Sequence, residues 1–377
     1  AYYFGILYSF FGLDYSAYRI TNQIFKIIAT LSLYPLVLYV SKRRLLAFLA
    51  TFIYAIHFST FGLLDGPSRG GNFIAIALMN LFLLAYFYVS KKKISNIFIS
   101  FSLSIWLLII ILFGSTRLFP LIAIVPLVEL FNLRDKIKKG METTIKRLAV
   151  VYFPFLLLFL FSPKSISMQI GYIGGLFEKV MMGNWQLFLT PFAVMGSTYI
   201  PEDFWPFFGK AFYDNFSSFL SSLLIQAVLV YFVLLIFIVF FISKKPLRFL
   251  THNLVFSFII GVVVYFIDHN WLLLNITIRT PVDPGTFLIP ALIGLFIMTT
   301  SFCIFLEWKE SEKKNNLHPF LFLAPIFSLI FIFLTWMFAD INSIFMGVHA
   351  YLTIPSIGTS IVLATILVLI YERLSRF

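Results

Sequence analysis

The amino-acid sequence predicts an all-α integral membrane protein, a polytopic bundle of about 11 transmembrane helices. Two features of the composition carry this prediction: 60% of the 377 residues are hydrophobic and only 12% are charged. A soluble domain of this length needs more charge to cover its surface. The apolar residues form continuous runs long enough for the roughly 20 helical residues that cross a bilayer. Because these runs do not alternate with polar residues, they favour helices over the strands of a barrel.

The apolar runs place the transmembrane segments along the chain. Together we expect them to form a single polytopic membrane domain over residues 1–377. The chain begins at Ala1 without a methionine or a charged flank, so we also expect missing upstream sequence that includes a further N-terminal helix. The predicted segments are 15–40, 46–63, 73–90, 97–113, 118–132, 148–161, 216–242, 249–267, 286–306, 319–338 and 356–371.

The basic residues orient these segments. Of the 28 Lys and Arg residues, 20 fall in loops that alternate with loops holding only six, and Arg19 and Lys26 lie within the first segment. Short loops rich in Lys and Arg are typical of the cytoplasmic side, so we predict a cytoplasmic C-terminus. This placement also accounts for the net charge of +12 through an anionic membrane surface, without a nucleic-acid partner. The basic clusters occupy residues 42–44, 91–93, 134–147, 244–248, 309–314 and 373–376.

The opposite loops are the predicted location of function. The longest, 162–215, is interpreted as an extracytoplasmic loop with interfacial or re-entrant helices, because one more span there would invert every later basic cluster. Its Phe, Trp, Gly and Met content is too apolar for a disordered segment. Loops 64–72, 268–285 and 339–355 share this side, and all three contain acids, while the first two also contain one arginine each. Any active site is therefore expected on the outer face.

The 64–72 loop holds the most informative candidates. Asp65 could act as a general base or bind a metal ion, and Arg69 could bind a phosphate through two parallel hydrogen bonds. The alternative is a tight turn in which Asp65 and Arg69 form an ion pair or cap the helix that starts near Asn72. No spacing of Cys and His residues suggests a metal cage, so no cofactor is predicted, although a divalent metal stays open as an alternative.

Other polar residues lie near the same predicted boundary. His269 and Arg279 could form a second wall of a site. Arg19 and Lys26 are seven residues apart on one face of the first helix, where they could bind a lipid phosphate or extend toward the membrane surface. His57 is expected to make an interhelical hydrogen bond, with a functional role as the alternative.

The first quarter of the chain resembles a known family. Residues 11–22 read Phe-Gly-Leu-Asp-Tyr-Ser-Ala-Tyr-Arg-Ile-Thr-Asn, residues 47–58 read Ala-Phe-Leu-Ala-Thr-Phe-Ile-Tyr-Ala-Ile-His-Phe, and the pair Ser68-Arg69 follows. Over about residues 11–93 this pattern is similar to the polyprenol-dependent GT-C glycosyltransferases, in their protein O-mannosyltransferase and transmembrane-tetratricopeptide branch. Phe58 stands where the family usually has proline. The family's catalytic acid lies in a loop that would precede Ala1.

The resemblance implies a membrane glycosyltransferase that transfers a sugar from a polyprenyl-phosphate carrier to an acceptor on the outer face. Asp65 would then be an acid near the acceptor, and Arg69, Arg279, His269 and Arg19 would bind the lipid phosphate of the donor. The expected partners are membrane lipids and this donor. Two alternatives from other classes remain open: a lipid or sugar transporter, and a non-catalytic subunit of a membrane assembly.

Overall fold

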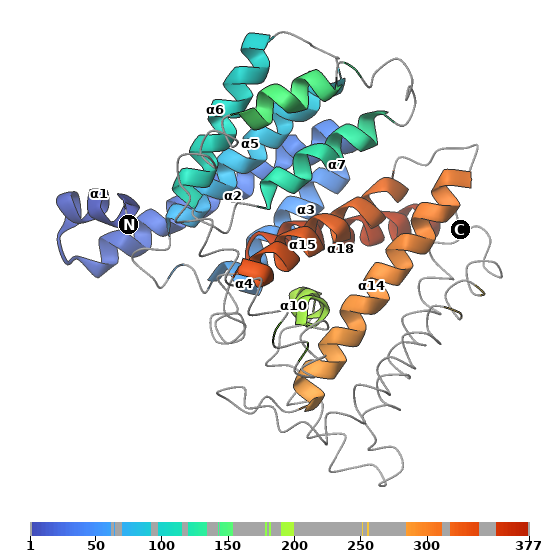
Figure 1. The fold of residues 1–377 in the computed structure, drawn as a ribbon. Helices are drawn as coiled ribbons and strands as arrows, with labels where there is room; N and C mark the ends of the chain where they lie inside the picture. The colour runs from blue at the N-terminus through green and yellow to red at the C-terminus, as the bar shows by residue number, and fades with distance from the viewer. Residues whose placement is uncertain are drawn as a thin grey trace, which may run out of the picture. The chain divides into compact units, whose positions relative to one another are not determined.

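The structure is a computed structural model in which the chain forms two compact units. Unit 1 comprises Ala1–Gly174, Leu334–Asp340 and Gly347–Ile354, and unit 2 comprises Gly175–Phe333, Ile341–Met346 and Pro355–Phe377. Every regular element in the described part of the chain is a helix (Figure 1). The described residues are 2–61, 64, 70–91, 97–114, 120–133, 142, 144–153, 178, 181, 190–199, 251, 255, 284–310, 317–338 and 352–375.

The helices of unit 1 follow the predicted segments closely. Residues 144–153 form a further helix at the start of the segment predicted at 148–161. Only the segment predicted at 46–63 is divided, between α3 and α4. The labelled helices are α1 (Tyr2–Phe11), α2 (Tyr15–Ser41), α3 (Arg44–Ile56), α4 (Phe58–Phe61), α5 (Gly71–Lys91), α6 (Ile97–Gly114) and α7 (Leu121–Leu133).

In unit 2 the described helices α14, α15 and α18 also match predicted segments. The segments predicted at 216–242 and 249–267 lie outside the described residues, apart from positions 251 and 255. The labelled helices are α10 (Thr190–Tyr199), α14 (Pro284–Glu310), α15 (His318–Phe338) and α18 (Pro355–Leu374).

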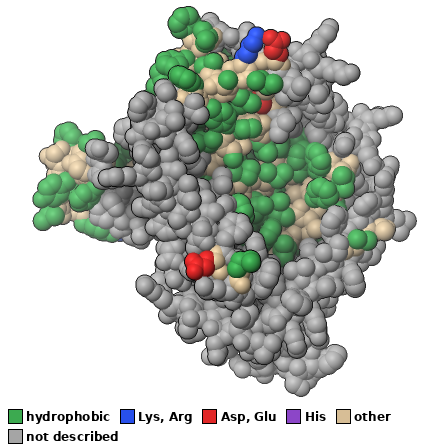
Figure 2. Space-filling view, viewed as in Figure 1, with side chains coloured by type: hydrophobic (Ala, Val, Ile, Leu, Met, Phe, Trp, Pro, Cys, Tyr) green, Lys and Arg blue, Asp and Glu red, His purple; other side chains and the backbone are tan. Residues whose placement is uncertain are grey.

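In the described part of the chain, three helices are long and apolar enough to cross a bilayer: α2, α5 and α18. Several shorter helices are equally apolar, and many large hydrophobic side chains are exposed, among them Phe98, Phe48 and Ile20 at 78%, 58% and 62%. Figure 2 shows that apolar side chains dominate the described surface on the face drawn. Water penalises such a surface and lipid does not, so these features indicate a membrane protein. The number of spans and their orientation remain predictions.

The start of α2 is fixed by its sequence. Gly12 takes a positive φ of 56°, which reverses the chain after α1, and the carboxylate of Asp14 accepts hydrogen bonds from the backbone N–H groups of Ser16 and Ala17. A side-chain cap of this kind satisfies amides that the first helical turn leaves unpaired. The hydroxyl of Tyr18 donates to the carbonyl of Gly12 at 2.7 Å. These contacts join α1 and α2 into the hairpin visible in Figure 1.

The helix predicted over 46–63 is interrupted at His57. α3 ends at Ile56 because His57 takes an extended conformation (φ −63°, ψ 129°), and the four-residue α4 follows. The buried imidazole contacts Ser59 through Nδ1, which lies 2.8 Å from the hydroxyl and also accepts from the backbone N–H of Ser59. The ring therefore caps the first turn of α4. This contact is local to the break, and the expected interhelical hydrogen bond of His57 stays a prediction.

Unit 1 is organised around α2, which packs against both α3 and α5. Asn80, fully buried in the middle of α5, donates to the hydroxyl of Ser32 at 3.0 Å and to the carbonyl of Ala29 at 3.4 Å. An amide that bonds across two helices in apolar surroundings fixes their relative register. α5 also packs against α6 and α7.

Unit 2 is held together by small residues that allow close backbone contact. A Cβ at Gly196 of α10 would overlap the carbonyl of Pro290, and a Cβ at Gly294 of α14 would overlap the carbonyl of Phe192. Such reciprocal glycine contacts are typical of closely crossing membrane helices. α10 is also joined to α18 by a 2.6 Å hydrogen bond between the hydroxyls of Thr198 and Thr359.

Candidate functional site

Of the predicted site residues, the structure describes Arg19. It lies on the exposed side of α2, one helical turn after the Asp14 cap. Asp65, Arg69, His269 and Arg279 lie outside the described residues. Their predicted convergence therefore stays a prediction, but the two ends of the segment that carries Asp65 and Arg69 are described.

Both ends of this segment contact the same side chain. Asn22 on α2 is fully buried, and its carboxamide donates to the carbonyl of Leu64 at 3.4 Å. On the other side of the segment, Gly70 lies so close to Asn22 and Tyr3 that a Cβ would overlap the amide oxygen of Asn22 and the ring hydroxyl of Tyr3. The entry and exit of residues 65–69 are thus fastened to one point on α2.

Tyr3 completes this attachment point from α1. Its hydroxyl donates to the amide oxygen of Asn22 at 2.7 Å, and its ring packs edge-on against Phe25 with 6.0 Å between the centroids. Partial burial raises the pKa of Tyr3 to about 12. The phenol therefore stays protonated at neutral pH and keeps its role as the hydrogen-bond donor. We refer to Tyr3, Asn22, Leu64 and Gly70 as the loop anchor.

Lys26 lies one helical turn beyond Asn22 and is also buried, with 6% of its surface exposed. Its ammonium nitrogen lies 3.6 Å from the centroid of the Phe61 ring, at the end of α4. No described carboxylate forms an ion pair with it. A lysine buried beside an aromatic ring without a counter-charge is uncommon, because the ammonium loses its hydration. Arg19, seven residues earlier, stays exposed, so the two cations that the sequence groups together have different surroundings.

A second set of hydroxyls stabilises the chain around α4. The hydroxyl of Thr353 donates to the backbone carbonyl of Ser59 at 3.1 Å, and the hydroxyl of Thr60 donates to the carbonyl of His57 at 2.7 Å. All these residues are buried within unit 1. The helix break at His57 is therefore rigidly held, and it sets the position of Phe61 next to Lys26.

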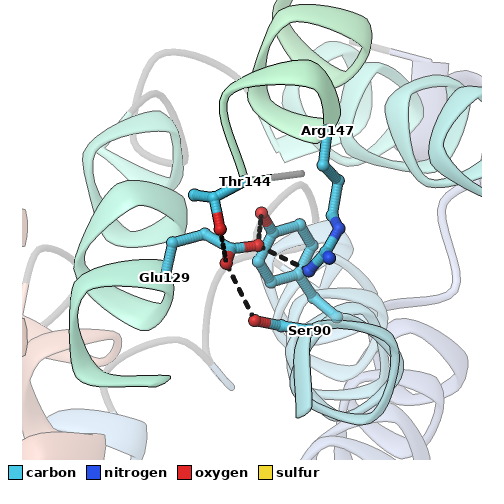
Figure 3. Close-up of polar contacts among 5 residues, drawn as sticks. Ser90, Glu129, Thr144 and Arg147 are labelled. Carbon is cyan, nitrogen blue, oxygen red and sulfur yellow. Dashed lines mark hydrogen bonds and ion pairs between the residues drawn. The ribbon is translucent and has the colours of Figure 1, made fainter. Parts of the chain in front are cut away.

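A separate charged cluster lies at the other end of unit 1 (Figure 3). Glu129 of α7 and Arg147 are each 3% exposed and form an ion pair of 2.8 Å. The other carboxylate contacts come from Tyr86 at 2.8 Å, Ser90 at 3.0 Å and Thr144 at 3.4 Å. Three helical segments therefore converge on one carboxylate whose lone pairs are all used. We call this group the Glu129 cluster.

The Glu129 cluster was not predicted from the sequence. Arg147 stands among the basic residues of 134–147 that are interpreted as a solvated cytoplasmic loop, whereas the structure buries it. The available signal was position: Glu129 lies near the cytoplasmic end of one predicted span, and Arg147 immediately precedes the next. An acidic and a basic residue at the same membrane depth on consecutive spans can form a buried ion pair.

Neither cluster has the composition of a metal site. Within the described part of the chain, no three His, Cys, Asp or Glu side chains are gathered closely enough to hold an ion. Comparison of the chain with protein-family models, with curated proteins and with solved structures finds no match.

Proposed function

We propose that this chain is a membrane glycosyltransferase of the GT-C type, which transfers a sugar from a polyprenyl-phosphate carrier to an acceptor on the outer face. The observation that best supports this proposal is the loop anchor. It fastens both ends of the segment bearing Asp65 and Arg69 to α2 and leaves five residues between them. A short segment fixed at both ends can present an acid and a guanidinium with little entropy to lose on binding.

The chemistry of sugar transfer from a lipid phosphate needs two kinds of group. A carboxylate must accept the proton of the acceptor hydroxyl, and cations must stabilise the phosphate that leaves. Asp65 and Arg69 supply one group of each kind within five residues. Arg279, His269 and Arg19 are the further cations that we assign to the donor phosphate in this proposal. A divalent metal could assist, which chelation of the purified protein would reveal as a loss of transfer.

The test is sugar transfer by purified protein in liposomes, with a polyprenyl-phosphate sugar as donor. We expect Asp65→Asn and Arg69→Ala each to lower the transfer rate by about 100-fold or more, because each removes a group that acts in the transition state. The matched control is Asp14→Asn, which alters an acid of the same α1–α2 region that serves only as a helix cap. Full activity in both site variants, measured on folded protein, would remove the 64–72 loop from the reaction.

One observation favours a second candidate, a transporter for a lipid or a sugar. α10 has ten residues, a length of about 15 Å, so it cannot cross a bilayer core of about 30 Å, yet eight of its residues are buried in unit 2. Short helices enclosed by longer ones are common in transporters, where their ends contribute to the substrate site.

A flux measurement separates the two candidates. Liposomes that contain the protein and a fluorescent lipid-linked sugar would show movement between leaflets if the chain transports, and a new glycosidic product if it transfers. Inter-leaflet movement without product, unaffected by Asp65→Asn, would favour the transporter.

A further inference from the structure

We propose that Lys26 binds the phosphate group of a polyprenyl-phosphate lipid, in a site bounded by Lys26, Phe61 and the loop anchor. The inference rests on the proposed function and deepens it, because the sequence leaves open whether Lys26 binds a lipid phosphate or extends toward the membrane surface. It starts from an energetic imbalance at Lys26.

The imbalance is a buried cation for which the described residues supply no anion. Lys26 is 6% exposed, and among the described residues its ammonium has the Phe61 ring as its only polar or cation–π contact. An ammonium has three N–H donors, and an aromatic face satisfies one side of it at most. Removing such a group from water without hydrogen-bond acceptors costs several kcal/mol. A fold tolerates this cost most readily where a ligand supplies the missing acceptors.

The neighbouring groups suit a phosphate ester. Asn22 lies one turn away on the same face of α2, so the polar surface extends from Lys26 to the loop anchor. A phosphate has several acceptor oxygens and can therefore supply the hydrogen-bond acceptors that the ammonium of Lys26 lacks among the described residues.

The surroundings favour a lipid over a free phosphate. Phe61 is 49% exposed at the surface, so the ring that covers Lys26 on one side borders the region where acyl chains would lie. Lys26 is also sixteen residues before Lys42, or roughly 24 Å along α2. With Lys42 at the predicted cytoplasmic boundary of a core about 30 Å thick, Lys26 lies a few ångströms below the outer headgroups. A lipid phosphate needs only a short displacement to reach it.

The test measures binding rather than transfer. Purified protein is titrated in nanodiscs with a long-chain polyprenyl phosphate, with the corresponding polyprenol and with inorganic phosphate, and intrinsic tryptophan fluorescence or thermal stabilisation reports binding. We expect the wild-type protein to prefer the phosphate over the alcohol by at least tenfold. Lys26→Met should abolish this preference, because it keeps the volume of the side chain and removes its charge.

The matched control is Lys91→Met. Lys91 also lies near an aromatic ring, 5.8 Å from the centroid of Tyr39, but it is exposed. Its replacement should leave the tenfold preference intact. The melting temperature of Lys26→Met distinguishes a binding lysine from a purely structural one. We expect it to equal or exceed that of the wild type, since the variant no longer buries an ammonium that has no anion among the described residues. Replacing a structural lysine would instead lower the melting temperature.

Three results would overturn the inference: an undiminished phosphate preference in Lys26→Met, loss of folded protein in that variant, or inorganic phosphate binding as tightly as the lipid. Failure of the proposed function looks different. If the chain binds polyprenyl phosphate through Lys26 but transfers no sugar, the phosphate site stands and the glycosyltransferase does not.

Discussion

The loop anchor with Lys26 and the Glu129 cluster are two buried polar groups of unit 1 that differ in how completely they are satisfied. In the Glu129 cluster every carboxylate lone pair has a donor and the charge is balanced by Arg147 at 2.8 Å, while the buried Nε of Arg147 has no hydrogen-bond partner among the described residues. Beside the loop anchor, Lys26 contacts an aromatic ring and no described carboxylate. Asn22 and Lys26 are almost fully buried, like Glu129 and Arg147, so burial alone does not distinguish the two groups.

This difference separates a structural role from a binding role. A charge whose partners are all internal stabilises one arrangement of helices and has no capacity left for a ligand. A charge whose partners are incomplete costs stability in the free protein and gains it when a ligand binds. We therefore assign the Glu129 cluster to the architecture and Lys26 to function, and the predictions below test that division.

The largest expected effect is the loss of one partner in the Glu129 cluster. Glu129→Leu leaves Arg147 buried without a counter-charge and removes the acceptor of Tyr86 and Ser90. We expect the free energy of unfolding to fall by about 3–5 kcal/mol. The measurement is denaturation by SDS in mixed micelles, followed by tryptophan fluorescence.

The double variant Glu129→Leu with Arg147→Met is the informative companion. It removes both charges, so we expect it to recover most of the stability that Glu129→Leu loses. A double variant as unstable as the single one would show that the hydrogen bonds of Tyr86 and Ser90, rather than charge balance, hold the cluster together. Binding of polyprenyl phosphate should be unchanged in the folded double variant.

An intermediate effect is expected at the loop anchor. Gly70→Ala introduces a Cβ that overlaps Asn22 and Tyr3, and we expect a loss of about 1–3 kcal/mol in stability. Gly71→Ala is the matched control, since a Cβ there meets only the Tyr3 ring at 3.2 Å and beyond. Under the proposed function, Gly70→Ala should also lower sugar transfer more than Gly71→Ala does. Equal transfer by the two variants would contradict a role for the anchor in placing Asp65 and Arg69.

The helices themselves were well predicted from the sequence, because long apolar runs leave the backbone few alternatives in lipid. α2, α5 and α6 begin and end within about two residues of the predicted segments, and α18 extends three residues beyond its predicted end. The break at His57 was not predicted, since it depends on how one imidazole caps the next turn. Residues 46–63 form one continuous apolar run in the sequence, so the composition predicts a single unbroken helix there.

The polar clusters were harder to predict, because they depend on which helix faces come together. Lys26 and Arg19 share a face by spacing alone, yet the structure buries the first and exposes the second. Arg147 follows Lys146 directly, yet only Arg147 turns inward to Glu129. Gly12, Asp14 and Asn22 shape the α1–α2 turn and the loop anchor, and the resemblance to the glycosyltransferases, which residues 11–22 help to carry, stays a prediction.

The smallest expected effect on stability comes from removing the exposed ion pair of Lys146 and Glu142, the surface counterpart of the buried Glu129–Arg147 pair. Lys146 donates to Glu142 at 2.7 Å, but their side chains are 72% and 80% exposed. The hydrogen bond and charge of Lys146 lower the pKa of Glu142, so any stabilisation is present above the ordinary pKa of a glutamate and is lost as pH falls through the lowered value. Glu142→Gln should therefore have little effect on unfolding at pH 7 and none at acidic pH, because solvent screens an exposed pair. SDS titrations of both proteins at the two pH values would measure this. A large loss of unfolding free energy in Glu142→Gln at pH 7 would show that an exposed charge can also stabilise the fold. Neither exposure nor burial would then identify which charges are structural.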